Sequence, residues 1–117
     1  MSYKAPIMTT VISPAVFMQG YLSDIIITIE CGGLCPHRYI FHGFDVLEYH
    51  IKSIGVSSDD ANYLCSYLEK SYLDMIRDCC KAGNMTDPRD GGDNLITLDD
   101  RCKEILTSCG LWPREGG

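Results

Sequence analysis

The sequence predicts a small α+β domain in which an N-terminal β-hairpin packs against a layer of three to four helices. Three observations predict this fold. Apolar and polar residues alternate over 24–30, a Gly-Gly pair follows at 32–33, and apolar residues from Phe44 onward recur at helical spacing. The 117 residues are 45% hydrophobic and 22% charged, which suits one globular core. We therefore expect a single domain over residues 1–117.

The N-terminal part of the chain is expected to supply the strands. Residues 1–20 are interpreted as an N-terminal arm or strand, with a short strand or irregular segment over 8–17. Within the strand at 24–30, the side chains of Ile25, Ile27 and Ile29 lie on one face, because successive strand residues point to opposite sides. These isoleucines are therefore the predicted apolar face of the hairpin.

The length of the following turn leaves two registers open. A two-residue loop at 32–33 pairs Glu30 with Cys35 and places Cys31 and Cys35 on opposite faces. A three-residue loop over 32–34 pairs Cys31 with Cys35 and puts both thiols on the apolar face. We favour the longer loop, because its second strand can continue to Phe41. In that register the pairs are Ile29 with His37, Ile27 with Tyr39 and Ile25 with Phe41.

Helical signals dominate after residue 44. A first helix runs to about Ile54 and ends at Gly55, and Ser57 with Asp60 has the spacing of a capping box for a long helix over 59–82. The apolar stripe predicted for the long helix consists of Ala61, Leu64, Cys65, Leu68, Met75, Ile76 and Cys79.

The C-terminal part begins with a predicted acidic Gly/Pro loop over 83–94. Leu95-Ile96 then forms a brief strand, and Thr97 with Asp100 is interpreted as a capping box that opens a helix ending at Gly110. The last residues, 113–117, are expected to form a loose tail.

Charge and composition narrow the functions. The net charge is −6, almost all of it beyond residue 55, and no basic patch is present, so direct nucleic-acid binding is not expected. No apolar run reaches the length of a membrane span, and the segment Ile7–Met18, broken by Pro14, is expected to be retained rather than cleaved as a signal peptide. We therefore predict a protein of the cytoplasm or nucleus that does not bind membranes.

The seven cysteines form no disulfide framework. Their number is odd, and Cys79 and Cys80 are adjacent in the predicted long helix, where they cannot bridge each other without distortion. Reduced thiols in an intracellular setting are therefore expected.

One cluster has the composition of a metal site. Cys31, Cys35, His37 and His42 lie within twelve residues around the predicted hairpin tip, and thiolates and imidazoles are the ligands that zinc prefers. The spacing is not that of a common zinc ribbon, and the alternative is a pair of half-buried cysteines beside ordinary histidines. We predict no cofactor, with zinc at these four residues as the alternative.

No motif in the chain indicates catalysis. A Cys–His nucleophile pair could form from several residues, but the sequence does not show the geometry that such a pair needs. The chain has no C-x-x-C motif, no phosphate-binding glycine loop and no G-x-S-x-G motif. We therefore predict that the protein is not an enzyme.

One segment resembles a known family. Ser23-Asp24, the alternating strand, the turn with Leu34, and His37-Arg38-Tyr39-Ile40-Phe41 resemble the opening of a BTB/POZ domain, over about residues 21–41. The resemblance implies that His37-Arg38 begins a helix and that Asp24 and Arg38 form a buried charged pair near a dimer interface. It further implies homodimerisation, or recruitment to a cullin-type ubiquitin ligase scaffold. The stretch Asp45–Tyr49 departs from the family pattern.

Two classes of function follow. The first is a non-catalytic protein-interaction module that binds itself or a partner, as a BTB-like dimer or adaptor. The second is a small acidic inhibitor, of the kind that viruses and phages encode, which binds and blocks a host protein through an acidic face that imitates DNA. For this second class the predicted partner surface includes Asp87, Asp90 and Asp93. A zinc-stabilised binding module is the third possibility.

Overall fold

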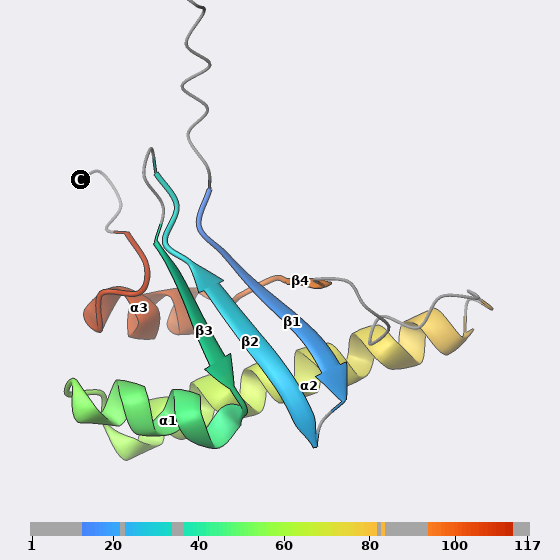
Figure 1. The fold of residues 1–117 in the computed structure, drawn as a ribbon, viewed down its shortest axis with the longest axis horizontal. Coiled ribbons are helices and arrows are strands. Elements are labelled where there is room, and N and C mark those ends of the chain that lie inside the picture. Colours follow the sequence, from blue (N-terminus) through green and yellow to red (C-terminus); the bar gives the residue numbers. More distant parts are fainter. Residues whose placement is uncertain (1–12, 22, 34–36, 82, 84–93, 114–117) are drawn as a thin grey trace, which may run out of the picture.

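The computed structural model describes residues 13–21, 23–33, 37–81, 83 and 94–113. Its strands form one antiparallel sheet in the order β3-β2-β1-β4, and three helices pack against that sheet (Figure 1). The predicted α+β fold class is confirmed. In chain order the elements are β1 (Ala15–Tyr21), β2 (Asp24–Glu30), β3 (Arg38–His42), α1 (Phe44–Ser53), α2 (Ser58–Lys81), β4 (Asn94–Ile96) and α3 (Asp100–Ser108).

The first hairpin joins β1 to β2, with Tyr21 opposite Asp24. Gly20 makes this tight connection feasible. Its φ is 91°, and a Cβ added there would lie only 2.6 Å from the backbone oxygen of Asp24. The N-terminal strand, predicted within 8–17, lies at Ala15–Tyr21, and residues 1–12 lie outside the described part.

The second hairpin, β2–β3, has a register that neither sequence prediction gave. Ile29 pairs with Tyr39 and Ile27 with Phe41, and the backbone N–H of Cys31 donates to the carbonyl of His37 at 3.0 Å. Five residues, 32–36, thus separate the paired positions. The two-residue and three-residue loops predicted from the sequence were therefore both wrong. In the favoured register Pro36 would have stood within the strand, where it has no N–H to donate.

The favoured register differs from the observed one by two residues. Because strand side chains alternate with a period of two, an even shift keeps every apolar residue on its predicted face. The predicted apolar face of the hairpin is therefore correct although its pairing is not. His37-Arg38 begins no helix, since β3 starts at Arg38 and α1 only at Phe44.

Local signals set most of the helix ends. Gly55, at φ 109°, follows α1 as predicted. Ser57 accepts a hydrogen bond at Oγ from the N–H of Asp60 at 3.2 Å, so the predicted cap of α2 is confirmed. The predicted cap of α3 was wrong by two residues. Asp99, rather than Thr97, accepts the N–H of Cys102, while the carbonyl of Thr97 accepts the hydroxyl of Tyr67 at 2.9 Å.

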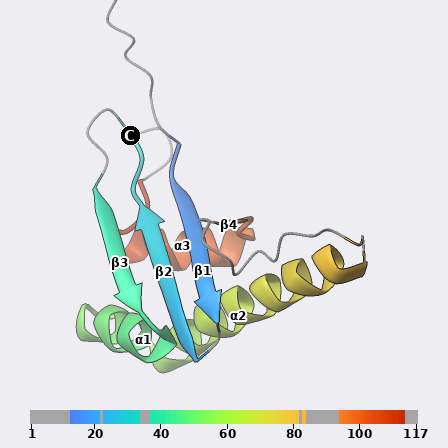
Figure 2. The ribbon, with the colours of Figure 1, turned by 45° about the vertical axis from the view of Figure 1, so that its right-hand side comes forward.

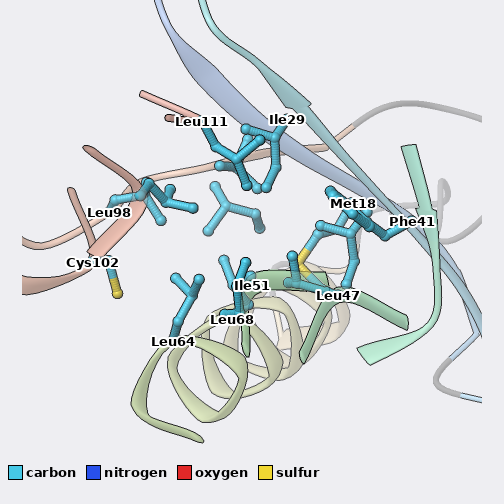
Figure 3. Packing of buried hydrophobic residues seen from close by; sticks show 14 of the residues in the cluster. Met18, Ile29, Phe41, Leu47, Ile51, Leu64, Leu68, Leu98, Cys102 and Leu111 are labelled. Carbon is cyan, nitrogen blue, oxygen red and sulfur yellow. The ribbon is translucent and has the colours of Figure 1, made fainter. Parts of the chain in front are cut away.

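All three helices lie on the same face of the sheet (Figures 1 and 2). The core fills the space between these two layers (Figure 3), and every described strand and helix contributes to it. The stripe predicted for α2 supplies Ala61, Leu64 and Leu68, but it omitted Tyr72, which is fully buried and donates its hydroxyl to the carbonyl of Gly20 at 2.9 Å. The other buried apolar residues are Val16, Met18, Ile25, Ile27, Ile29, Phe41, Leu47, Ile51, Ile96, Leu98, Cys102, Ile105, Leu106 and Leu111.

None of the helices among the described residues is both long enough and apolar enough to cross a membrane.

Candidate protein-interaction site

The face of the sheet turned away from the helices carries an apolar row across all four strands. The register places Ile40 beside Thr28, Thr28 beside Phe17, and Phe17 beside Leu95. Thr28 is buried between its neighbours, whereas the two ends of the row, Ile40 and Leu95, are 53% and 57% exposed. No described helix covers this row (Figures 1 and 2).

β3 is an edge strand, and its outward backbone groups can be identified. Successive residues of a strand point their N–H and C=O groups to opposite sides. Because the carbonyl of His37 accepts the N–H of Cys31, the odd-numbered residues that follow in β3, Tyr39 and Phe41, also point their backbone groups at β2. The groups of Arg38, Ile40 and His42 therefore point to the free edge. Proteins commonly protect such edges with lysine, proline, a bulge or a covering segment. Here the one charge on β3 is turned inward, since Arg38 bonds Glu30 on β2 at 2.8 and 3.1 Å.

Helix α1 extends this edge below the sheet. Its His50 ring contacts the ring of Phe41 on β3, with centroids 5.2 Å apart, whereas the carbonyl of Phe44 contacts the thiol of Cys65 on α2. Because 46 and 50 are one turn apart, Val46 lies on the β3 side of the helix. Val46 is 48% exposed and Tyr49 77% exposed. We call the combined surface the β3–α1 edge; it consists of Arg38, Ile40, His42, Val46, Tyr49 and His50.

The predicted metal ligands are only partly brought together. Cys31 and His37 are opposite each other at the end of the β2–β3 hairpin, and Cys35 lies outside the described residues. His42 is five residues beyond His37, about 16 Å along the strand direction at 3.3 Å per residue. It also points to the opposite face of the sheet. No group of three or more potential ligands occurs among the described residues.

The Cys31 thiol lies against the C-terminal end of α3 instead, with its Sγ 3.4 Å from the carbonyl oxygen of Leu111. Burial raises the pKa of this thiol and that of Cys109. On α2, burial together with the nearby carboxylates of Glu48 and Asp45 raises the pKa of Cys65 to about 12. These three thiols are therefore protonated at neutral pH.

The charged residues implicated by sequence are separated. Asp24 is exposed at the β1–β2 turn, while Arg38 lies at the other end of the β2–β3 pair and bonds Glu30. The buried pair of Asp24 with Arg38 that the family resemblance implies is thus not formed. Asp87, Asp90 and Asp93 lie outside the described residues.

Sequence reasoning missed the β3–α1 edge. The strand itself was predicted as far as Phe41, and in it the exposed Arg38, Ile40 and His42 alternate with the more buried Tyr39 and Phe41. That β3 lies at the edge of the sheet, however, follows only from the order of the strands.

Comparison with known proteins gives no match: no protein-family model, no curated protein and no solved structure is significantly similar to this chain.

Proposed function

We propose that the protein is a non-catalytic protein-interaction module that associates with a second copy of itself through the β3–α1 edge. The observation that carries the proposal is the free edge of β3, with the exposed side chain of Ile40 at its centre. Unpaired strand edges are templates for pairing with another chain.

A two-fold axis at Ile40 gives a self-consistent pairing. The two β3 strands run antiparallel, the Ile40 residues of both copies lie opposite each other, and Arg38 of one copy lies opposite His42 of the other. All three outward-facing residues of each strand then exchange backbone hydrogen bonds across the axis. The four-stranded sheets become one sheet of eight strands.

The charge of the β3–α1 edge and the surface area that it can bury are compatible with this pairing. Two copies with a net charge of −6 repel each other, but the β3–α1 edge contains no carboxylate. Pairing of two short strands buries less than the roughly 1,200–2,000 Å² of a stable interface. The exposed side chains of Val46 and Tyr49 on α1 supply further apolar contact beside the strands.

The test is the oligomeric state measured by light scattering after size exclusion, over a range of protein concentrations. We expect a concentration-dependent dimer at low and at high salt, and a monomer for Ile40→Lys. Leu73→Lys is the matched control, because Leu73 is 42% exposed on α2 and lies outside the proposed interface. A monomeric wild-type protein at every concentration, or equal effects of the two lysine substitutions, would contradict the proposal.

The resemblance to a BTB/POZ domain supports this proposal less than the free edge of β3 does. The helix that a BTB/POZ domain would begin at His37-Arg38 is replaced by β3. Homodimerisation agrees with the β3–α1 edge, while the adaptor role toward a cullin-type ligase stays a prediction from the resemblance.

The second candidate is the acidic inhibitor, and the uneven charge of the chain favours it. A monomer whose partner binding weakens steeply as salt rises would support this function, because exposed charges are screened within about 10 Å at 0.1 M salt. In that case the triple change of Asp87, Asp90 and Asp93 to Asn should slow association with a basic partner. Unaltered association would exclude these three residues from the interface.

A further inference from the structure

A groove lies at the other edge of the sheet, between β4 and the C-terminal half of α2. Its volume is about 600 Å³. One wall is the Met75 and Cys79 stripe of α2 with the ring of Tyr67, and the other wall is the β4 strand and Thr97. The described lining residues are Tyr67, Ser71, Asp74, Met75, Asp78, Cys79, Leu95, Ile96 and Thr97.

The groove exists because α2 is longer than the sheet is wide. The 24 residues of α2 span about 36 Å at 1.5 Å per residue, whereas three inter-strand spacings of about 4.8 Å span roughly 14 Å. The C-terminal turns of α2 consequently run past β1 and β4 (Figures 1 and 2). These turns keep an apolar stripe, with Met75 and Cys79 only partly buried. The position beside β4 is where a fifth strand of the sheet would lie.

The backbone of β4 faces this position. In an antiparallel sheet, successive residues of a strand point their backbone groups to opposite neighbours, and the Cys31–His37 bond shows which residues of β2 point to β3. Following this alternation through the pairing of β2 with β1 and of β1 with β4, the N–H and C=O of Leu95 point away from β1. Two contacts agree with this alternation. Asn94 Nδ2 donates to the carbonyl of Met18 on β1 at 3.1 Å, and the carbonyl of Thr97 points outward to the hydroxyl of Tyr67. Leu95 thus offers one donor and one acceptor to the groove.

The groove is also acidic. Asp74 is already engaged, by Arg77 one turn on and by Lys70 at 3.9 Å one turn back. Asp78 lies on the same side of α2 and forms no ion pair or hydrogen bond with any residue of the described part. A cation that enters the groove therefore meets one uncompensated carboxylate, in a chain with a net charge of −6.

We propose that the groove binds an extended basic segment of a partner protein, which adds to β4 as a fifth strand and places a lysine or arginine against Asp78. The segment's backbone pairs with Leu95, its apolar side chains cover Met75 and Cys79, and its cation bonds the carboxylate of Asp78. The partner segment binds at β4, whereas the second copy of the protein binds at β3, the opposite edge of the sheet. A dimer formed through β3 therefore leaves the groove of each copy open.

The probe is a labelled peptide of about eight residues in which every second residue is valine or lysine and the residues between them are threonine, since alternate residues of a strand share one face and only that face is turned to α2. Binding is followed by fluorescence polarisation to the full-length protein. We expect Asp78→Lys to weaken binding by about tenfold, the loss that follows from removing one charge-assisted hydrogen bond. Glu69→Lys is the matched control, because Glu69 is exposed on the same helix but does not line the groove, and it should change binding by less than about twofold.

Two further measurements distinguish a peptide that binds by adding a strand to β4 from one that binds only through attraction between opposite charges. Methylation of alternate backbone nitrogens of the peptide should abolish binding, because the strand donors are removed while the charge is kept. A peptide with glutamate in place of lysine should bind Asp78→Lys better than it binds the wild type. Thermal melts confirm that each variant is folded.

The proposal is overturned if Glu69→Lys and Asp78→Lys weaken binding equally, if the methylated peptide binds as well as the parent peptide, or if the parent peptide does not bind. Because Ile40→Lys leaves the groove intact, it should retain peptide binding. Failure of the dimer and failure of the groove are therefore distinguishable.

Discussion

The hydroxyl of Tyr63 on α2 donates a hydrogen bond to Oδ2 of Asp99, the residue that caps α3. The other carboxylate oxygen, Oδ1, accepts the backbone N–H of Cys102 at 2.8 Å. Arg101 completes the contact, since its guanidinium lies 4.0 Å from the centroid of the Tyr63 ring. The bond from Tyr63, followed by that from Cys102, favours the ionised carboxylate and lowers the pKa of Asp99. The cap of the last helix is therefore held in place by the helix before it.

This relationship predicts a pH-dependent effect of Tyr63→Phe. A carboxylate whose native pKa is lowered contributes stability above its unfolded pKa of about 4, and that stability is lost as pH falls through the native value. The substitution removes the bond, so the variant should be less stable than the wild type at pH 7. The difference should shrink once Asp99 is protonated. Urea unfolding of both proteins at pH 7 and in strong acid measures this, and an equal difference at both pH values would contradict the assignment.

Asp99→Ala provides the control for that experiment. The loss of an N-cap costs about 1 kcal/mol, and in this background Tyr63 has no carboxylate to bond. We expect Tyr63→Phe to have little further effect at neutral pH when Asp99 is already replaced.

Gly20→Ala should destabilise the fold more than Gly55→Ala does. Both glycines have positive φ, 91° and 109°, so each substitution carries the conformational cost of a side chain in that region. Only at Gly20 would the new Cβ meet backbone, the Asp24 oxygen at 2.6 Å, whereas nothing lies within 4 Å at Gly55. We expect a loss above about 1 kcal/mol at Gly20, measured by denaturant unfolding. Equal losses at the two positions would mean that the β1–β2 turn adjusts without cost.

The elements that sequence predicted well carry their signals locally. The start of α2 is set by Ser57 and Asp60, three residues apart, and its buried stripe follows from helical spacing. The cap of α3 shows where local signals end. Thr97 and Asp99 are both capping residues, and the hydroxyl of Tyr63, distant in sequence, is bonded to Asp99. A tertiary contact thus distinguishes two positions that are locally equivalent.

The candidate interaction site was less predictable for the same reason. The pairing of Ile29 with Tyr39 depends on a loop two residues longer than the one favoured from Gly32-Gly33. The free edge of β3 depends on the pairing of β1 with both β2 and β4, which leaves β3 outermost. No local pattern contains this information, although the exposed Ile40 between Tyr39 and Phe41 is consistent with it.

The cysteines should differ widely in their rate of alkylation. Cys80 is exposed on the last turns of α2, whereas Cys102 is buried and burial raises its pKa. Cys65, with its pKa raised to about 12, is also protonated at neutral pH. Because the thiolate is the nucleophile, iodoacetamide should label Cys80 well before Cys65 and Cys102 in the folded protein. Mass mapping over time measures the order.

The same mapping in denaturant without reductant tests the prediction that all thiols are reduced. The six cysteines of the described part form no disulfide, and we expect all seven of the chain to be labelled. A bridged pair would overturn the reduced-cysteine prediction.

The last prediction concerns zinc at the end of the β2–β3 hairpin. His42 lies on the opposite face of the sheet from Cys31 and about 16 Å along the strand from His37, so it cannot complete a site with them. Cys31 is directed at the carbonyl of Leu111, beside α3. We therefore expect protein purified without added metal to contain far less than one equivalent of zinc, and a chelator to leave its melting temperature unchanged. His42→Ala should alter neither quantity. A full equivalent that Cys31→Ser removes, with a fall in melting temperature on chelation, would instead assign zinc to Cys31, Cys35 and His37 with a fourth ligand other than His42.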